Sequence, residues 1–112
     1  MYQIEAVIKP QKVDEVTEAL NAIGIVGMTV VEAKGYGRQK GVTETYRGSE
    51  YSIKFVPKVM VKIVVKSSDL EKTVKLVQEK TRTGEIGDGK IFVSKLENVI
   101  RIRTGESGEA AV

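Results

Sequence analysis

A glycine-rich stretch late in the chain carries the residue types best suited to binding an anion. It reads Thr83-Gly84-Glu85-Ile86-Gly87-Asp88-Gly89-Lys90-Ile91-Phe92-Val93. Glycine adopts positive φ without steric cost and has no Cβ, so backbone N–H groups of residues 84–90 can converge on a ligand. Lys90 adds a full positive charge at the same place. The stretch therefore predicts a phosphate-binding loop over residues 82–90, although a glycine-rich hairpin without a ligand would look similar.

Three arginines could complete such a site. Arg38 lies in a second glycine cluster, and Arg101 and Arg103 stand two positions apart. On an extended strand, residues two apart point to the same side, so both arginines would face one ligand. With Lys90, they could hold a polyphosphate through bidentate contacts. For Arg101 and Arg103 alone, a solvated strand face remains an alternative.

The composition indicates a soluble globular protein. The chain has 112 residues, of which 41% are hydrophobic and 29% are charged, as in one compact domain covering residues 1–112. No apolar run approaches the roughly 20 residues of a membrane span. The N-terminus lacks the layout of a signal peptide, so we expect a cytoplasmic protein.

The residue types that are missing exclude several kinds of chemistry. The sequence has no cysteine and no histidine, which excludes disulfides, zinc sites of the usual kind and a Ser-His triad. A metal would have to be a hard cation held by oxygens, such as Mg²⁺ shared with a phosphate. The formal charge of +3 suits small anionic ligands and is only a weak indication of nucleic acid.

The hydrophobic pattern predicts two β-α-β units. Strand patterns at 4–9 and 61–66 are each followed by helical spacing, first over 13–23 and then from residue 70. Pro10 is the expected start of the first helix, and Ser67, Ser68 and Asp69 are candidates for the N-cap of the second. Further strands are expected at 28–34 and 90–98, with 99–103 continuing in extended form. This order predicts an α+β, ferredoxin-like βαββαβ sandwich, with a four-stranded antiparallel sheet and both helices on one face. Val, Ile and Met on the other face would need a cover, which favours a homo-oligomer.

A long connection separates the two units. About 20 residues between Gly35 and Pro57 contain several glycines and the aromatic residues Tyr36, Tyr46 and Tyr51. Such a length is uncommon in a compact domain unless the segment is functional or disordered. We expect residues 37–55 to be a mobile arm that contacts partners, with a merely protruding hairpin as the alternative. The polar tail 104–112 is also expected to be mobile.

The motifs taken together resemble those of the PII-type nitrogen-regulatory signal proteins over essentially the whole chain. They are Ile8-Lys9-Pro10, Gly24-Ile25-Val26-Gly27-Met28-Thr29-Val30, Lys34-Gly35-Tyr36-Gly37-Arg38-Gln39-Lys40-Gly41, Tyr46-Arg47-Gly48-Ser49-Glu50-Tyr51, Pro57-Lys58, the stretch 83–93 and Arg101-Ile102-Arg103-Thr104-Gly105-Glu106.

The resemblance implies a homotrimer of ferredoxin-like subunits in which ATP and ADP compete for clefts between neighbours. Gly87, Asp88, Gly89 and Lys90 would wrap the phosphates, which Lys90, Arg101 and Arg103 would neutralise. Thr29 and Val64 would lie at the adenine. Gly35, Gly37, Arg38 and Gln39 would approach from the base of the arm.

The resemblance also implies a second effector and an output. 2-Oxoglutarate would bind only beside Mg·ATP, with Gln39 as a ligand of Mg²⁺ and Lys58 paired with a carboxylate. The arm would dock onto an ammonium channel or enzymes of nitrogen metabolism through Tyr46, Arg47 and Tyr51. Tyr51 matches a position that is nucleotidylated in some branches, and Ser49 one that is phosphorylated in others.

Three residues depart from the family pattern. Lys62 stands where Glu is usual, Val42 where His is frequent, and Tyr36 where Phe is usual.

Three other functions compete with that of a PII-type regulator. An RNA-binding module is disfavoured because the expected central strands have no aromatic residue for base stacking. An enzyme is disfavoured because no set of residues resembles a nucleophile paired with a base. A trimeric, nucleotide-only regulator that does not bind 2-oxoglutarate, or a metal-tolerance protein of the same fold, remains open.

Overall fold

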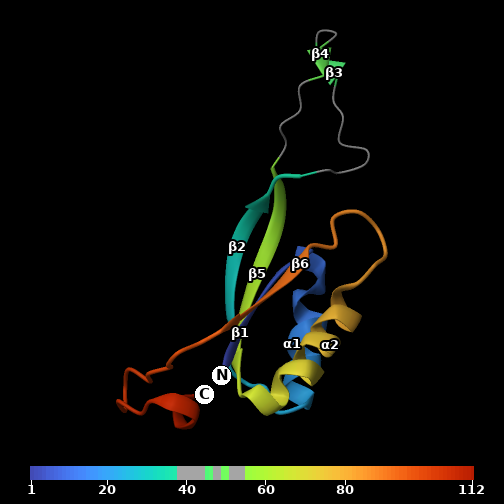
Figure 1. Ribbon diagram of the computed structural model, residues 1–112. Helices are drawn as coiled ribbons and strands as arrows, with labels where there is room; N and C mark the ends of the chain where they lie inside the picture. The colour runs from blue at the N-terminus through green and yellow to red at the C-terminus, as the bar shows by residue number, and fades with distance from the viewer. Residues whose placement is uncertain (38–44, 47–48, 51–54) are drawn as a thin grey trace.

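The computed structural model describes residues 1–37, 45–46, 49–50 and 55–112, and the side chains of 1–37 and 55–112. Strands β1 (Tyr2–Ile8), β2 (Thr29–Gly35), β5 (Val56–Val65) and β6 (Lys90–Lys95) form one sheet in the order β2-β5-β1-β6. All its neighbours are antiparallel. Helices α1 (Val13–Ala22) and α2 (Leu70–Thr81) cover one face of it (Figure 1). The predicted ferredoxin-like sandwich is confirmed.

Both helices are entered through a short 3₁₀ turn. Pro10 begins the turn before α1, where its fixed φ and missing N–H are harmless. Ser67–Asp69 form the turn before α2, but none of them caps that helix with its side chain, contrary to the sequence expectation. Asp69 pairs instead with Lys72 at 3.0 Å, and its carbonyl accepts a hydrogen bond from Thr73.

The core lies between the sheet and the helices. Alternate residues of the two central strands face it, and α1 and α2 add residues one or two turns apart. The largest fully buried aliphatic side chains are those of Ile4, Ile8, Leu20, Ile63, Val16, Val61, Val65 and Val77.

Truncation of one of these residues gives a first test. We expect Leu20→Ala to lower the free energy of unfolding by about 2–5 kcal/mol, because the 1% exposed side chain leaves a cavity. Val26→Ala is the control, since Val26 is 82% exposed and should change it by about 0.5 kcal/mol or less. Urea denaturation measures both variants, and equal losses would contradict this assignment of the core.

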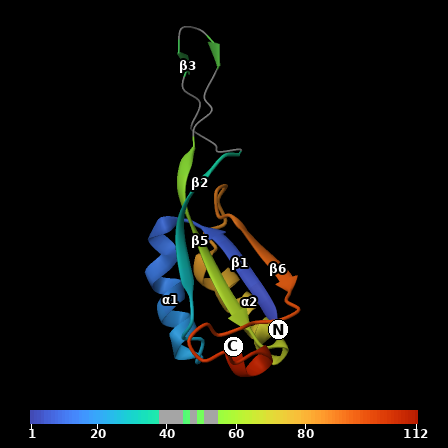
Figure 2. The same ribbon diagram turned by 90° about the vertical axis from the view of Figure 1, so that its left-hand side faces the viewer.

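The other face of the sheet is open and less apolar than the sequence suggested. The register places Val31, Met60 and Val7 in one row across it. The next row is Thr29, Lys62, Glu5 and Phe92. Figure 2 shows this face toward the viewer, with the helices behind it. The expected apolar surface is therefore divided by charged side chains at its centre.

The antiparallel pairing gathers two long connections at one end of the sheet. β1 and β2 end there, and β5 and β6 begin there. The connection between β2 and β5 and the loop between α2 and β6 both leave from this end (Figure 1). Within the first connection, β3 (Thr45–Tyr46) pairs with β4 (Ser49–Glu50).

The last part of the chain differs from the prediction. β6 ends at Lys95, three residues earlier than expected, because its partner β1 begins at Tyr2 opposite Lys95. Ile100 and Ser107 form an isolated bridge, and residues 102–104 between them form a turn. The extended form predicted for 99–103 is therefore wrong at 102–103. The tail, predicted to be mobile, contains a 3₁₀ helix at Gly108–Ala111.

Among the described residues, no helix combines the length and apolar character needed to cross a membrane.

Candidate anion-binding cleft at the glycine loop

A cleft of about 460 Å³ lies on the open-face side of the sheet, where the two connections meet. Gly35 and Gly37 line it from the end of β2, and Lys58 lines it from β5. The glycine loop and the start of β6 contribute Gly87, Gly89 and Lys90. The sequence singled out all six of these residues, and the fold brings them together.

Glycine is required at Gly89 for two reasons. Its φ is +93°, in the left-handed region that other residues rarely adopt. A Cβ built there would lie 1.6 Å from the carbonyl oxygen of Val7, because the loop passes directly over the end of β1. The absence of a side chain therefore lets the loop close onto the sheet.

Gly35 makes room for the buried lysine. A Cβ at this position would lie 3.0 Å from Cγ of Lys58, so the lysine side chain runs against the bare backbone of β2. Lys58 is only 8% exposed, and its ammonium donates a hydrogen bond to the carbonyl oxygen of Gly87. The lysine thus joins β5 to the glycine loop across the floor of the cleft.

The environment of the Lys58 ammonium favours an anionic partner. Burial lowers the pKa of its ammonium, the positive charge of Lys9 lowers it further, and the carboxylate of Asp88 opposes both. A buried ammonium with a lowered pKa is stabilised when an anion binds beside it. Lys58 is therefore suited to hold a carboxylate or phosphate.

Asp88 holds the loop from within. Its Oδ2 accepts hydrogen bonds from the backbone N–H groups of Thr83, at 2.9 Å, and Gly84, at 2.8 Å. The hydroxyl of Thr83 donates to its Oδ1. The Thr83 hydroxyl first, then these N–H groups and Lys9, keep the pKa of Asp88 well below its usual range, against a smaller effect of burial. The carboxylate thus fixes the shape that the loop presents to a ligand.

We expect Asp88→Asn to loosen this loop. An amide has one acceptor oxygen in place of two, so amide exchange at Thr83 and Gly84 should accelerate by about tenfold or more. Hydrogen exchange followed by NMR measures it. Because the pKa is lowered on folding, the wild-type carboxylate stabilises the loop above about pH 4 and loses this effect only as the pH falls well below that. Unchanged protection in the variant would contradict this role.

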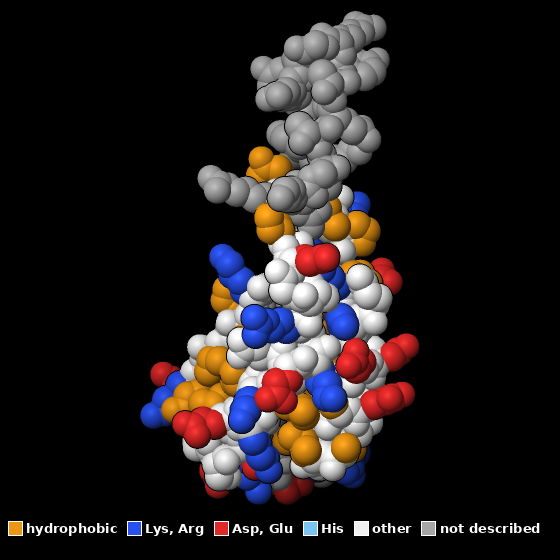
Figure 3. Space-filling model, turned by 90° about the vertical axis from the view of Figure 1, so that its right-hand side faces the viewer, with side chains coloured by type: hydrophobic (Ala, Val, Ile, Leu, Met, Phe, Trp, Pro, Cys, Tyr) orange, Lys and Arg blue, Asp and Glu red, His pale blue; other side chains and the backbone are white. Residues whose placement is uncertain are grey.

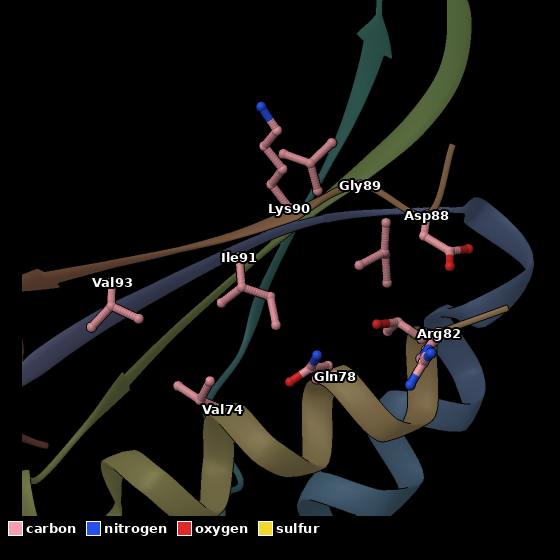
Figure 4. A pocket seen from close by; sticks show the side chains of 11 residues that line it. Val74, Gln78, Arg82, Asp88, Gly89, Lys90, Ile91 and Val93 are labelled. Atoms are coloured by element: carbon pink, nitrogen blue, oxygen red, sulfur yellow. The ribbon is translucent and has the colours of Figure 1, made fainter. Parts of the chain in front are cut away.

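A second hollow, of about 340 Å³, lies on the other side of β6 against α2. In Figure 4, Val74, Gln78 and Ile91 point into it, whereas Lys90 points away from α2. The side chain of Lys90 therefore extends toward the cleft on the open face. The helical side of the molecule mixes positive and negative side chains (Figure 3), so the positive charge of the cleft is a local feature.

The remaining predicted site residues lie elsewhere. Thr29 and Val64 are at the far end of β2 and β5. Arg101 and Arg103 are exposed around the turn beyond β6. The six residues of β6 alone span about 17 Å from Lys90. One chain therefore does not bring these arginines to the glycine loop, which corrects the expectation that both point to one ligand from a shared strand.

Several predicted residues fall in the long connection. Arg38, Gln39, Arg47 and Tyr51 lie outside the described residues. Tyr46 and Ser49 are described only as paired backbone positions of β3 and β4.

Sequence reasoning missed two residues that support the glycine loop. Lys9 and Thr83 assist Asp88, but they come from the end of β1 and the end of α2. A local signal existed for Thr83 alone, because Thr and Asp at the two ends of a tight glycine loop commonly bond its backbone.

Comparison with known proteins places the chain in a family. The family model described as "Nitrogen regulatory protein P-II" matches residues 1–106. The chain belongs to the P-II family. It is 56% identical to the nitrogen regulatory protein P-II of Azospirillum brasilense and 56% identical to that of Rhizobium meliloti, over 100% of each chain. It is 52% identical to the nitrogen regulatory protein GlnK of Escherichia coli, again over 100% of both.

Membership in the P-II family confirms the resemblance drawn from the motifs. It identifies the chain as a nitrogen regulatory signal protein, which agrees with the expectation of a regulator rather than an RNA-binding module.

Proposed function

We propose that this P-II protein reports nitrogen, carbon and energy status. It binds ATP or ADP competitively, binds 2-oxoglutarate together with Mg·ATP, and acts on its targets through residues 37–55. The observation that carries the proposal is the cleft itself, where two lysines and a glycine loop meet at the base of the long connection. Ligands bound there would touch the loop and the root of the connection at once.

The phosphate chain is proposed to lie along the glycine loop. Gly87 and Gly89 have φ of +101° and +93° and expose backbone without a Cβ. Lys90 lies beside them and gives the loop its charge. Convergent N–H groups and one ammonium are enough to bind a phosphate, so this site does not require the N-terminus of a helix.

Completion of the nucleotide site is proposed to need a second copy of the chain. Thr29, Val64, Arg101 and Arg103 lie far from the glycine loop of their own chain, so a neighbour would supply them. Phe92 and Val31 on the open sheet face are 53% and 41% exposed, which suits burial between copies. We propose a homotrimer with a nucleotide between each pair of neighbours.

2-Oxoglutarate is proposed to take the place of the Gly87 carbonyl as partner of Lys58. The donor set fits this ligand, since Lys58 is a buried ammonium already within reach of the cleft. Mg²⁺ would need oxygen ligands, which Gln39, the phosphates and the oxoacid could supply. Because the oxoacid would complete the metal shell, its binding should depend on ATP and not ADP.

The output is proposed to run through the long connection, toward an ammonium transporter or enzymes of nitrogen metabolism. Arg47, Tyr46 and Tyr51 would contact the target. Modification of Tyr51 or Ser49 would add a bulky anionic group there and block docking. No catalytic role is proposed, so any hydrolysis of ATP would be incidental.

Calorimetric titration tests the proposal. 2-Oxoglutarate is titrated into the protein with Mg·ATP, with ADP and without nucleotide, and we expect heat only with Mg·ATP. Binding of ATP and ADP without any oxoacid binding would favour the nucleotide-only regulator. No nucleotide binding at all would refute the proposal. Sedimentation of the same samples should give the mass of a trimer.

A further inference from the structure

Lys9 lies between the sheet and the glycine loop, although it belongs to neither. It follows the last residue of β1, and its ammonium lies 3.3 Å from Oδ1 of Asp88. The same ammonium donates a hydrogen bond of 3.0 Å to Oγ1 of Thr83. The side chain of Lys9 is only 16% exposed, and that of Asp88 24%. Lys9 and the loop are 74 residues apart in sequence, so this contact exists only in the folded chain.

The position of Asp88 poses an electrostatic problem for the cleft. Its carboxylate must be ionised to accept the hydrogen bonds that shape the loop, yet an ionised carboxylate beside an anion site repels the ligand. Asp88 also attracts the ammonium of Lys58, which acts on the same ligand. Uncompensated, Asp88 would therefore weaken the site in two ways.

We propose that Lys9 is the counter-ion of Asp88 and thereby a positioning residue of the anion site. Lys9 neutralises the carboxylate and leaves Lys58 available to an anionic ligand. Thr83 takes part in the same arrangement, since its hydroxyl accepts from Lys9 and donates to Asp88. This inference rests on the proposed function only in that the cleft binds anions.

Anion affinity across a set of variants tests this role. Inorganic triphosphate serves as the probe, because it reports the charge of the cleft whichever physiological ligand the protein takes. We expect Lys9→Met to weaken triphosphate binding by about tenfold, as an uncompensated unit charge is left beside the ligand. Lys9→Arg keeps the charge and should bind within about threefold of wild type.

Lys12→Met is the matched control. It removes the same charge three residues away, from a partly exposed pair with Glu15 at 3.6 Å, and should leave triphosphate affinity within about twofold of wild type.

The double variant Lys9→Met/Asp88→Asn, compared with Asp88→Asn alone, tests whether Lys9 acts through Asp88. If Lys9 acts as a counter-ion, Lys9→Met weakens triphosphate binding much less in the Asp88→Asn background, where the loop is already loosened, than in the wild-type background. An equal loss in the two backgrounds shows a role independent of Asp88 and would overturn the inference. Wild-type affinity in Lys9→Met would overturn it as well, as would an equal loss in Lys12→Met.

The triphosphate series is independent of the proposed ligands. If ADP and 2-oxoglutarate do not bind while triphosphate affinity follows the expected order, the proposed function fails and the role of Lys9 stands. If wild type binds ADP but Lys9→Met binds triphosphate and ADP as tightly, the role of Lys9 fails alone. Thermal melting of each variant confirms that the affinities compare folded proteins.

Discussion

Gly89→Ala should abolish the nucleotide binding that we propose for this protein. The new methyl group would meet the carbonyl oxygen of Val7 at 1.6 Å, and the residue would have to keep a φ of +93°. The left-handed conformation alone costs a non-glycine residue about 1–3 kcal/mol. Since the clash is with backbone and not with a flexible side chain, the loop must lift off the end of β1. The N–H groups that would contact phosphate move with it.

We expect nucleotide affinity to fall by roughly a hundredfold or more, because several hydrogen bonds to a charged ligand are lost together. Calorimetry with ADP measures this. Two other glycines provide controls. Gly24 has a φ of +87° but open space around it, and Gly27 has open space without positive φ. Gly24→Ala therefore carries backbone strain without a clash, and Gly27→Ala carries neither. Equal affinity losses in Gly89→Ala and Gly24→Ala would refute the clash argument.

Lys58→Met should abolish 2-oxoglutarate binding and largely spare ADP. Methionine approximates the length of the lysine side chain without its charge, so a carboxylate loses its only proposed ammonium partner on β5. A charge-assisted hydrogen bond is worth about 1.5–3 kcal/mol, and leaving the carboxylate unpaired in the cleft costs more, so we expect at least a hundredfold loss. Lys34→Met, on exposed β2, is the control with the same change in net charge.

The pKa of Lys58 gives this prediction a second readout. Its folded-state pKa is lowered, so the folded protein carries the cost of a buried charge below that pKa and is relieved of it as the pH rises toward about 10.4. Lys58→Met removes the cost and should leave the melting temperature unchanged or higher at pH 7. Oxoacid affinity of the wild type should fall at alkaline pH, earlier than for an ordinary lysine. A variant that unfolds, or that loses ADP as strongly as the oxoacid, would contradict this assignment.

The fold was accessible from sequence because its signals are local. Alternating apolar residues at 4–8 and 61–65 predicted the two central strands, which pair with Ile4 opposite Ile63. Helical spacing at Val16 and Leu20 predicted a buried stripe, and both are 1% exposed. Errors arose where the outcome depends on a distant partner. β6 stops where β1 begins, and nothing near residues 96–98 in the sequence records that limit.

The candidate site was accessible in part for the same reason. Residue type alone indicated that the glycines at 84, 87 and 89 could take positive φ, and all three adopt it. The arginines at 101 and 103 were misplaced, because a hydrogen bond from Gly105 to Arg101 turns the chain where the pattern of residues reads as a strand.

By itself, the sequence determined the β-α-β repeat, the glycine loop with its lysine, and membership in the P-II family. Residue type fixes backbone freedom, hydrophobic period and charge, and each of these acts over a few neighbours. The tertiary structure alone decided that Lys58 reaches the carbonyl of Gly87, 29 residues away, and that Lys9 pairs with Asp88. It also placed Arg101 and Arg103 at the opposite end from the loop. Such contacts follow from strand register and packing, which bring together groups that no local pattern relates.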